Sequence, residues 1–277
     1  MKSEYSLIDS GSGRKLERFG PYVIARPCAQ AVWMPTLSEA EWNQADAQFT
    51  REPDNRWLKK QGLKEFWTAD IAGVRFKLSP TDFGHLGIFP EQRPFWEWLT
   101  KTATKEMKVL NLFAYSGGST LAAARGGAQV CHLDASKGMV AWARENAALS
   151  GLDNAPIRWI TDDVNKFLVR EIKRNSRYEG IILDPPSFGR GAHGEVFKIE
   201  DEINQLLKTC RELLSDHPKF ILFSCHTPGF TPIAMHHLLE QTMRGIPGKI
   251  DSGEMILSGE SGVLSIPSGT FARWQRE

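Results

Sequence analysis

Val-Leu-Asn-Leu-Phe-Ala-Tyr-Ser-Gly-Gly, residues 109–118, is the stretch that decides the fold of this chain. Its apolar start is typical of a buried strand, its two glycines are typical of a tight turn, and residues 119–125 behind it favour a helix. A strand that passes through a glycine-bearing turn into a helix is typical of the entrance to a nucleotide-cofactor site. We therefore expect a ligand site at this turn.

Polar side chains also follow the next three expected strands. Asp134 ends the second strand, Asp162 and Asp163 end the third, and Asp184 follows the fourth. The carboxyl ends of parallel strands meet at one edge of a sheet, which is where open α/β folds bind ligands. There the Asp134 carboxylate can accept hydrogen bonds from the two hydroxyls of a ribose, and we expect Asp163 near an adenine amino group.

The spacing of the turn bears on which cofactor binds. It departs from the G-x-G-x-x-G pattern, because Phe113 and Tyr115 stand where tighter turns have glycine. A pyrophosphate needs close approach of the backbone at a helix N-terminus. These bulky residues therefore favour S-adenosylmethionine (SAM), which has no phosphate, over NAD. An α/β core whose aspartates merely begin its loops remains open as an alternative.

Five segments together resemble one known family. The chain is similar to class I SAM-dependent methyltransferases, and within them to the bacterial large-subunit (23S) ribosomal RNA methyltransferases, from about Phe83 to the C-terminus. The better-known relatives carry an N-terminal PUA RNA-binding domain, for which this sequence shows no clear counterpart. The segments that carry the resemblance are Gly-Ile-Phe-Pro-Glu-Gln-Arg (87–93), Asn-Leu-Phe-Ala-Tyr-Ser-Gly-Gly (111–118), His-Leu-Asp-Ala-Ser (132–136), Asp-Asp-Val (162–164) and Asp-Pro-Pro-Ser-Phe (184–188).

The resemblance implies a fold, a cofactor and a substrate. The fold is α/β, with a Rossmann-like seven-stranded methyltransferase sheet; the cofactor is SAM and the substrate is RNA, most directly ribosomal RNA. The residues that we expect to bind the cofactor are Gln92, Asn111, Phe113, Tyr115, Gly117, Asp134, Ala135, Asp162, Asp163 and Asp184.

Methyl transfer needs an aligned nucleophile more than it needs acid or base groups, because the sulfonium methyl group is already electrophilic. Asp184 can accept a hydrogen bond from an amino or ring N–H group of the target base. Pro185 and Pro186 have a fixed φ and would hold Phe188 as a rigid wall against the face of the base. We therefore expect these four residues to be catalytic.

Cys225 follows the fifth expected strand at the same edge. Carbon-5 of a pyrimidine becomes nucleophilic only after a thiolate adds to carbon-6, so a 5-methylcytosine enzyme needs such a cysteine. The sequence resembles cytosine-modifying members of the family at Ser224-Cys225, but His226 replaces a small polar residue and Ser187 stands where a lysine is frequent. Buried cysteines at strand ends are also common, so both a nucleophilic and a structural role stay open.

Composition bounds the class of protein. The 277 residues are 41% hydrophobic and 24% charged, which is typical of a globular protein with one substantial core and a small appended domain. No apolar run approaches the ~20 residues of a membrane span, and the polar start is not a signal peptide. We expect a cytoplasmic protein with four free thiols. The spacing of the histidines, His85, His193 and the pair at 236–237, predicts no metal site.

The N-terminal part is expected to form a separate unit. Residues 15–27 and 65–78 are typical of two hairpins, and a capping box at Ser38 predicts a helix between them. We place a small β-rich domain at residues 1–80 and the catalytic domain at 81–277, in which strands and helices alternate. Net charge is only +1, so a surface for RNA must be local. The basic residues of the first quarter alternate with tryptophans that can stack on bases; the alternative is a solvated face over an aromatic core. These residues are Arg14, Lys15, Arg18, Arg51, Arg56, Lys59, Lys60 and Lys64, with Trp33, Trp42, Trp57 and Trp67.

The sequence therefore predicts a SAM-dependent methyltransferase that acts on a base of RNA. Two alternatives remain. One is a methyltransferase for a small molecule or a protein, which the near-neutral charge favours. The other is an RNA-binding protein that has lost SAM; the presence of Gly117, Asp134 and Asp163 speaks against it.

Overall fold

The computed structural model describes residues 4–51, 54–190, 196–260 and 262–276. The chain divides into two compact units, Met1–Pro94 with Ile256–Ser268 and Phe95–Met255 with Gly269–Glu277. The first unit runs past the boundary at residue 80 expected from the sequence, to Pro94, and a later segment of the chain joins it. Gly259 forms a β-bridge with Leu7, and the Ser10 hydroxyl donates to the carbonyl of Leu264 at 3.3 Å.

The first unit contains a five-stranded sheet in the order β1-β2-β3-β4-β5 and a separate hairpin, β6–β7. Both hairpins expected from the sequence are confirmed, since β2 pairs with β3 and β6 with β7 in antiparallel register. Each turns through residues with positive φ, Gly20 in the first and Ala72-Gly73 in the second. The sequence did not predict β1, β4 or β5. The strands are β1 (Tyr5–Gly11), β2 (Arg14–Phe19), β3 (Tyr22–Pro27), β4 (Ala47–Thr50), β5 (Arg56–Lys59), β6 (Trp67–Ile71) and β7 (Val74–Leu78).

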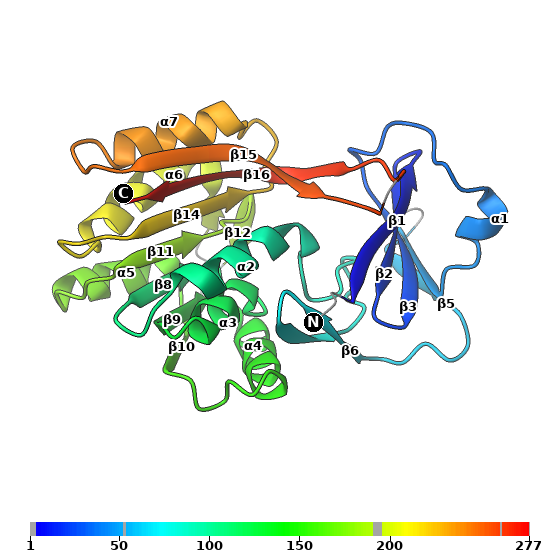
Figure 1. Ribbon diagram of the computed structural model, residues 1–277, viewed down its shortest axis with the longest axis horizontal. Helices are drawn as coiled ribbons and strands as arrows, with labels where there is room; N and C mark the ends of the chain where they lie inside the picture. The colour runs from blue at the N-terminus through cyan, green and yellow to red at the C-terminus, as the bar shows by residue number, and fades with distance from the viewer. Residues whose placement is uncertain (1–3, 52–53, 191–195, 261, 277) are drawn as a thin grey trace. The chain divides into compact units, whose positions relative to one another are not determined.

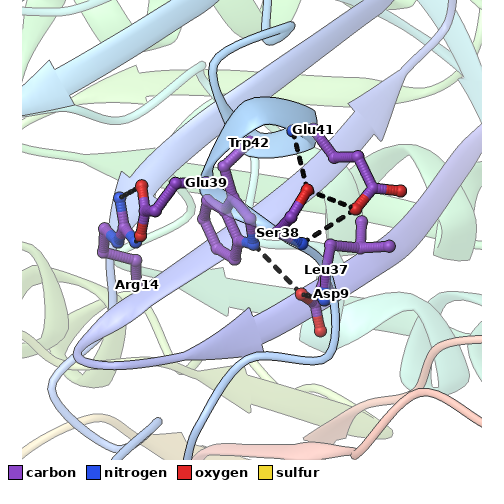
Figure 2. Close-up of polar contacts among 7 residues, drawn as sticks. All are labelled: Asp9, Arg14, Leu37, Ser38, Glu39, Glu41 and Trp42. Atoms are coloured by element: carbon purple, nitrogen blue, oxygen red, sulfur yellow. Dashed lines mark hydrogen bonds and ion pairs between the residues drawn. The ribbon is translucent and has the colours of Figure 1, made fainter.

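The short helix α1 (Glu39–Trp42) begins at the predicted capping box (Figure 2). The Ser38 hydroxyl accepts a hydrogen bond from the Glu41 N–H, and the Glu41 carboxylate accepts one from the Ser38 N–H at 2.8 Å. One turn of helix is too short to be stable alone. Its position must therefore come from contacts with the sheet.

Buried Asp9 of β1 supplies these contacts (Figure 2). Its carboxylate accepts hydrogen bonds from the Leu37 N–H at 2.8 Å and from the Trp42 indole N–H at 3.0 Å. On the other side, the Arg14 guanidinium lies 4.7 Å from the centre of the Trp42 ring and pairs with Glu39. The helix is thus fixed to the sheet by polar bonds as well as by packing.

The second unit is built on a seven-stranded sheet in the order β10-β9-β8-β11-β14-β16-β15 (Figure 1), which confirms the predicted fold. The first five strands of this order are parallel and β16 is antiparallel to β14. The strands are β8 (Lys108–Leu112), β9 (Gln129–Asp134), β10 (Ile157–Thr161), β11 (Gly180–Leu183), β14 (Phe220–Cys225), β15 (Lys249–Leu257) and β16 (Ile266–Gln275), with a small hairpin of β12 (Phe188–Arg190) and β13 (Val196–Lys198).

Helices cover both faces of this sheet; in Figure 1, α2 passes in front of it and α6 behind it. On one face, Trp98 of α2 packs against Phe220, with ring centroids 5.1 Å apart. On the other face, α5, α6 and α7 bury apolar residues against alternate strand positions such as Ile221 and Phe223. The helices of this unit are α2 (Arg93–Thr102, whose first two residues lie in the first unit), α3 (Gly118–Arg125), α4 (Lys137–Leu149), α5 (Val164–Lys173), α6 (Ile199–Glu212) and α7 (Pro232–Thr242).

Candidate active site

The turn between β8 and α3 has an unusual backbone. Phe113, Tyr115 and Gly117 all have positive φ, at 55°, 50° and 91°. The two aromatic residues therefore adopt the left-handed conformation that glycine normally takes, at a cost of roughly 1–2 kcal/mol each. The Phe113 ring is held by Phe197, 5.1 Å away. A side chain at Gly117 would be strained by its positive φ, and its Cβ would lie only 3.0 Å from the Cβ of Ala143.

Asp134 ends β9 beside this turn. One carboxylate oxygen accepts a hydrogen bond from the Tyr115 N–H and the other accepts one from the Ser136 N–H, both at 2.8 Å. Burial raises the pKa of the Asp134 carboxyl, while the two hydrogen bonds lower it. Each oxygen keeps a second lone pair for a ligand hydroxyl. Ala135 is exposed next to it.

The two aspartates after β10 are already engaged. Asp163 caps α5, and its carboxylate accepts a hydrogen bond from the Lys166 N–H at 3.0 Å. Asp162 forms an ion pair with Arg170. The Asp162 N–H also donates to the Asp134 carbonyl at 3.1 Å, which joins the ends of β9 and β10. Both aspartates therefore lie at the expected edge and also stabilise it.

Asn111 lies elsewhere. Its side chain is buried beneath α3, where its amide donates to the Thr120 hydroxyl at 2.8 Å, and that hydroxyl lies 2.9 Å from Nδ1 of His132. Burial lowers the pKa of His132 to about 3, so this imidazole is neutral. The structure does not bring the Asn111 side chain to the strand ends. Asn111 belongs to a buried polar network under the turn that the sequence did not reveal.

Gln92 belongs to the first unit, where it is buried in a short 3-10 helix (Pro90–Gln92). The strand-end residues described above belong to the second unit. The cofactor-binding role expected for Gln92 stays a prediction.

Asp184 and the residues after it form the next part of the edge. Pro185 is buried and Pro186 is exposed. Phe188 begins β12 with 49% of its surface exposed, so its ring is accessible to a substrate. The Asp184 carboxylate lies 3.5 Å from Nδ1 of His226.

A hydrogen bond joins this loop to the loop after β14. The hydroxyls of Ser187 and Thr227 lie 2.7 Å apart. Because Thr227 directly follows His226, this bond helps to fix His226 beside Asp184. The sequence showed both Ser187 and His226 as departures from the family, but it gave no sign that the two loops that carry them are joined.

Cys225 is the last residue of β14 and is fully buried. It belongs to the apolar core beneath α6 and α7, and its sulfur accepts a hydrogen bond from the Thr227 N–H at 3.4 Å. Burial raises the pKa of the thiol. A nucleophilic cysteine needs access and a lowered pKa. These observations favour the structural role of Cys225 over the nucleophilic one.

The family of S-adenosylmethionine-dependent methyltransferases matches this chain over residues 24–253. The chain belongs to that family. The "Ribosomal RNA large subunit methyltransferase K/L" of Marinobacter nauticus is 31% identical over 192 residues, which cover 68% of this chain and 26% of the relative. The protein of the same name from Shewanella frigidimarina is 35% identical over 60% of this chain and 23% of its own length. The chain spans about a quarter of the length of these curated relatives.

Solved structures agree with this assignment. The SAM-dependent methyltransferase from Agrobacterium tumefaciens is 43% identical and has a TM-score of 0.94, covering 100% of this chain and 91% of that one. A methyltransferase complexed with SAH has a TM-score of 0.78 at 20% identity, over 98% of this chain and 75% of that one, and so shows the shared fold alone. As a family member, this methyltransferase uses SAM as its cofactor.

Within the described part of the chain, no three His, Cys, Asp or Glu side chains gather as a metal site would require. His193, one of the histidines considered from the sequence, lies outside the described residues. None of the described helices combines the length and the apolar character that crossing a membrane requires.

Proposed function

We propose that this methyltransferase modifies a base of RNA, with ribosomal RNA as the substrate class and a nitrogen atom as the target. The observation that carries the RNA assignment is that the curated relatives from Marinobacter and Shewanella are both named as methyltransferases of large-subunit ribosomal RNA. An enzyme of ribosomal RNA would work in the cytoplasm.

The strand ends fit SAM by their chemistry. The first N–H groups of α3 point out of the positive end of the helix and suit the carboxylate of the amino-acid part. We propose that the turn at 113–117 lies under that part, that Asp134 binds the ribose hydroxyls, and that Asp162, Asp163 and Ala135 border the adenine. When bound, SAM supplies an electrophilic methyl group.

The preference for nitrogen rests on two side chains. Cys225 is buried with a raised thiol pKa, which opposes attack on carbon-6 of a pyrimidine. Asp184 is partly exposed and can accept a hydrogen bond from an N–H group of the base, with Phe188 against the face of the ring. Asp184, Pro185, Pro186 and Phe188 would orient the nitrogen rather than activate carbon.

The first unit supplies a candidate RNA surface. Lys59, Lys60 and Lys64 are exposed on and after β5, and Phe66 nearby is 55% exposed, with the Lys77 ammonium 5.0 Å from its ring centre. Exposed cations beside an aromatic ring suit phosphates and unstacked bases.

Other members of the set named from the sequence serve the fold instead. Arg14 pairs with Glu39, and Lys15 lies 3.3 Å from buried Glu17. Trp42 and Trp67 are buried, so they are unable to stack on a base.

Nucleoside mass spectrometry tests the proposal. Ribosomal RNA from a strain that lacks the gene should lose one N-methylated nucleoside, and the purified chain with labelled SAM should restore it. The Asp184→Ala variant should bind SAM and fail to restore it. If the ribosomal RNA of the deletion strain keeps its full set of methylated nucleosides, ribosomal RNA is not the substrate. That result would not contradict the assignment of SAM as the cofactor.

A further inference from the structure

We propose that His226 accepts the proton that the target nitrogen loses during methyl transfer, and that Asp184 orients and stabilises it. The inference rests on the proposed nitrogen methylation and names a further catalytic residue for it.

The fold places the pair with little freedom. β11 and β14 are parallel neighbours in which Leu183 lies opposite Phe223, so the residues that follow both strands leave the sheet at the same edge. Asp184 comes directly after β11 and His226 directly after β14, and Nδ1 of His226 lies 3.5 Å from Oδ1 of Asp184.

Two further contacts hold the loop that carries His226. The hydroxyls of Thr227 and Ser187 lie 2.7 Å apart, and the Thr227 N–H donates to the sulfur of Cys225. The residue after His226 is therefore fixed from two sides, which limits the positions that the imidazole can take. Cys225 here serves to anchor the loop.

Exposure separates this pair from the other candidate groups. The side chain of His226 is 35% exposed and that of Asp184 is 27% exposed, so both can meet a substrate. His132 and Cys225 are fully buried. Of these groups, His226 combines access with a carboxylate partner.

The reaction leaves a proton to be removed. The amino nitrogen of the base forms a bond to the methyl carbon with its lone pair, and the electron pair of the broken carbon–sulfur bond stays on sulfur, giving S-adenosylhomocysteine. The N–H electron pair then returns to nitrogen and the proton passes to Nε2 of His226. A carboxylate at this distance from Nδ1 favours the tautomer with a free Nε2 lone pair and stabilises the imidazolium electrostatically. An imidazole, with an ordinary pKa near 6.5, suits this task better than a carboxylate, whose ordinary pKa is near 4.

Single-turnover methylation of ribosomal RNA tests the role. His226→Ala should slow the chemical step roughly a hundredfold, the lower range for general base catalysis, with SAM and RNA affinities within twofold of wild type. Added imidazole should restore part of the rate, which it would not do if His226 only supported the loop. His217→Ala is the matched control, since His217 is exposed in the same unit and lies away from the strand ends that carry the site; it should turn over at the wild-type rate.

A second measurement needs no substrate. The His226 ring can be titrated by NMR in the full chain, with Asp184 and the Cys225 thiol as its charged or titratable neighbours. Asp184→Asn should lower the pKa of His226 by about 1, because the pairing carboxylate is gone, and leave His217 unchanged. Failure of the wild-type chain to methylate RNA would overturn the proposed function. Two results would overturn the role of His226 alone. One is a His226→Ala variant as active as an active wild type, and the other is a His226 pKa that is the same in the wild type and in Asp184→Asn.

Discussion

At the scale of single residues, the aspartates of the strand ends differ in what they already bind. Asp163 caps a helix and Asp162 pairs with Arg170. Asp134 holds two backbone N–H groups that shape the turn. Asp134 shapes the turn and also lies at the cofactor site. Its replacement should therefore weaken cofactor binding more than it destabilises the folded chain.

Asp134→Asn should weaken SAM binding by about 1.5–3 kcal/mol, the range for hydrogen bonds to a charged group. The asparagine keeps the size of the side chain and one acceptor oxygen, so the chain should still fold. Isothermal titration calorimetry measures the change. Asp153→Asn, at an exposed position after α4, should leave the affinity unaltered. Unchanged SAM affinity in Asp134→Asn would remove Asp134 from the cofactor site.

The methylation rate of the Cys225→Ala variant should stay within a few fold of the wild-type rate. The reason is that Cys225 is buried, and burial disfavours the thiolate that a nucleophilic role would need. It should lose about 1 kcal/mol of stability for the removed sulfur in the core. Correspondingly, RNA that carries 5-fluorocytosine should not trap a covalent complex with the wild-type enzyme, since that trap needs a cysteine bonded to carbon-6. A trapped complex, together with an inactive alanine variant, would restore the nucleophilic role.

Buried His132 gives a pH dependence. Its pKa is about 3 in the folded chain against an ordinary value near 6.5, so the unfolded chain binds one more proton between these values. The stability linked to His132 is therefore complete above pH 6.5 and declines as pH falls toward 3, by at most about 1.4 kcal/mol per pH unit. Urea unfolding between pH 7 and 4.5 should show a shallower decline in His132→Gln than in wild type or in His217→Gln. Equal declines in all three proteins would show that His132 titrates normally.

At the scale of elements, contacts rather than propensity position the short pieces. The four residues of α1 are far below the length at which a helix is stable alone. Asp9 accepts hydrogen bonds from the Leu37 and Trp42 N–H groups (Figure 2) and from the Thr36 N–H. It thereby joins the segment before the helix, and the helix itself, to β1. A single substitution at Asp9 would therefore remove all three of these hydrogen bonds.

Asp9→Ala should destabilise the first unit by about 3 kcal/mol, because it removes charged hydrogen bonds and leaves buried donors unmatched. Hydrogen exchange at the Leu37 amide and urea unfolding followed by tryptophan fluorescence measure the loss. Asp82→Ala is the control, since Asp82 is exposed in the same unit. Equal stability of the two variants would show that α1 is held by apolar packing alone.

At the scale of the whole molecule, the chain separates into two units with different surfaces. The second unit carries the strand-end site, and the first carries exposed lysines on and after its edge strand β5. Lysines on an edge strand also prevent sheets from pairing with one another. Measurements of RNA affinity distinguish that role from a role in RNA binding.

Replacing Lys59, Lys60 and Lys64 with glutamine should weaken RNA binding and flatten its salt dependence by up to about 2–3 in the slope of log K against log salt, at roughly 0.7–0.9 per lost phosphate contact. SAM affinity should stay the same. A triple variant at exposed lysines of the second unit, Lys101, Lys105 and Lys208, is the control for net charge. If both triple variants lose RNA affinity equally, RNA binding depends on the overall charge of the protein, and the lysines of the first unit form no specific RNA-binding surface.

The amino-acid sequence alone determined the features that depend on near neighbours. The strand, turn and helix at 109–125, the two hairpins and the helix cap at Ser38 all came from short patterns, and the structure confirms each. The edge on which the strand-end aspartates meet followed from the parallel order of the strands. Such features follow from backbone preferences and hydrogen bonds within a few residues.

Only the tertiary structure decided which side chains face a substrate and which face the core. Alternation along β14 turns Cys225 toward α6 and α7, and alternation along β8 places Asn111 under α3. The pairing of β11 with β14 brings His226 to Asp184 across a long separation in sequence. These outcomes depend on register and on packing between distant segments, because a shift of one residue along a strand turns every side chain to the opposite face.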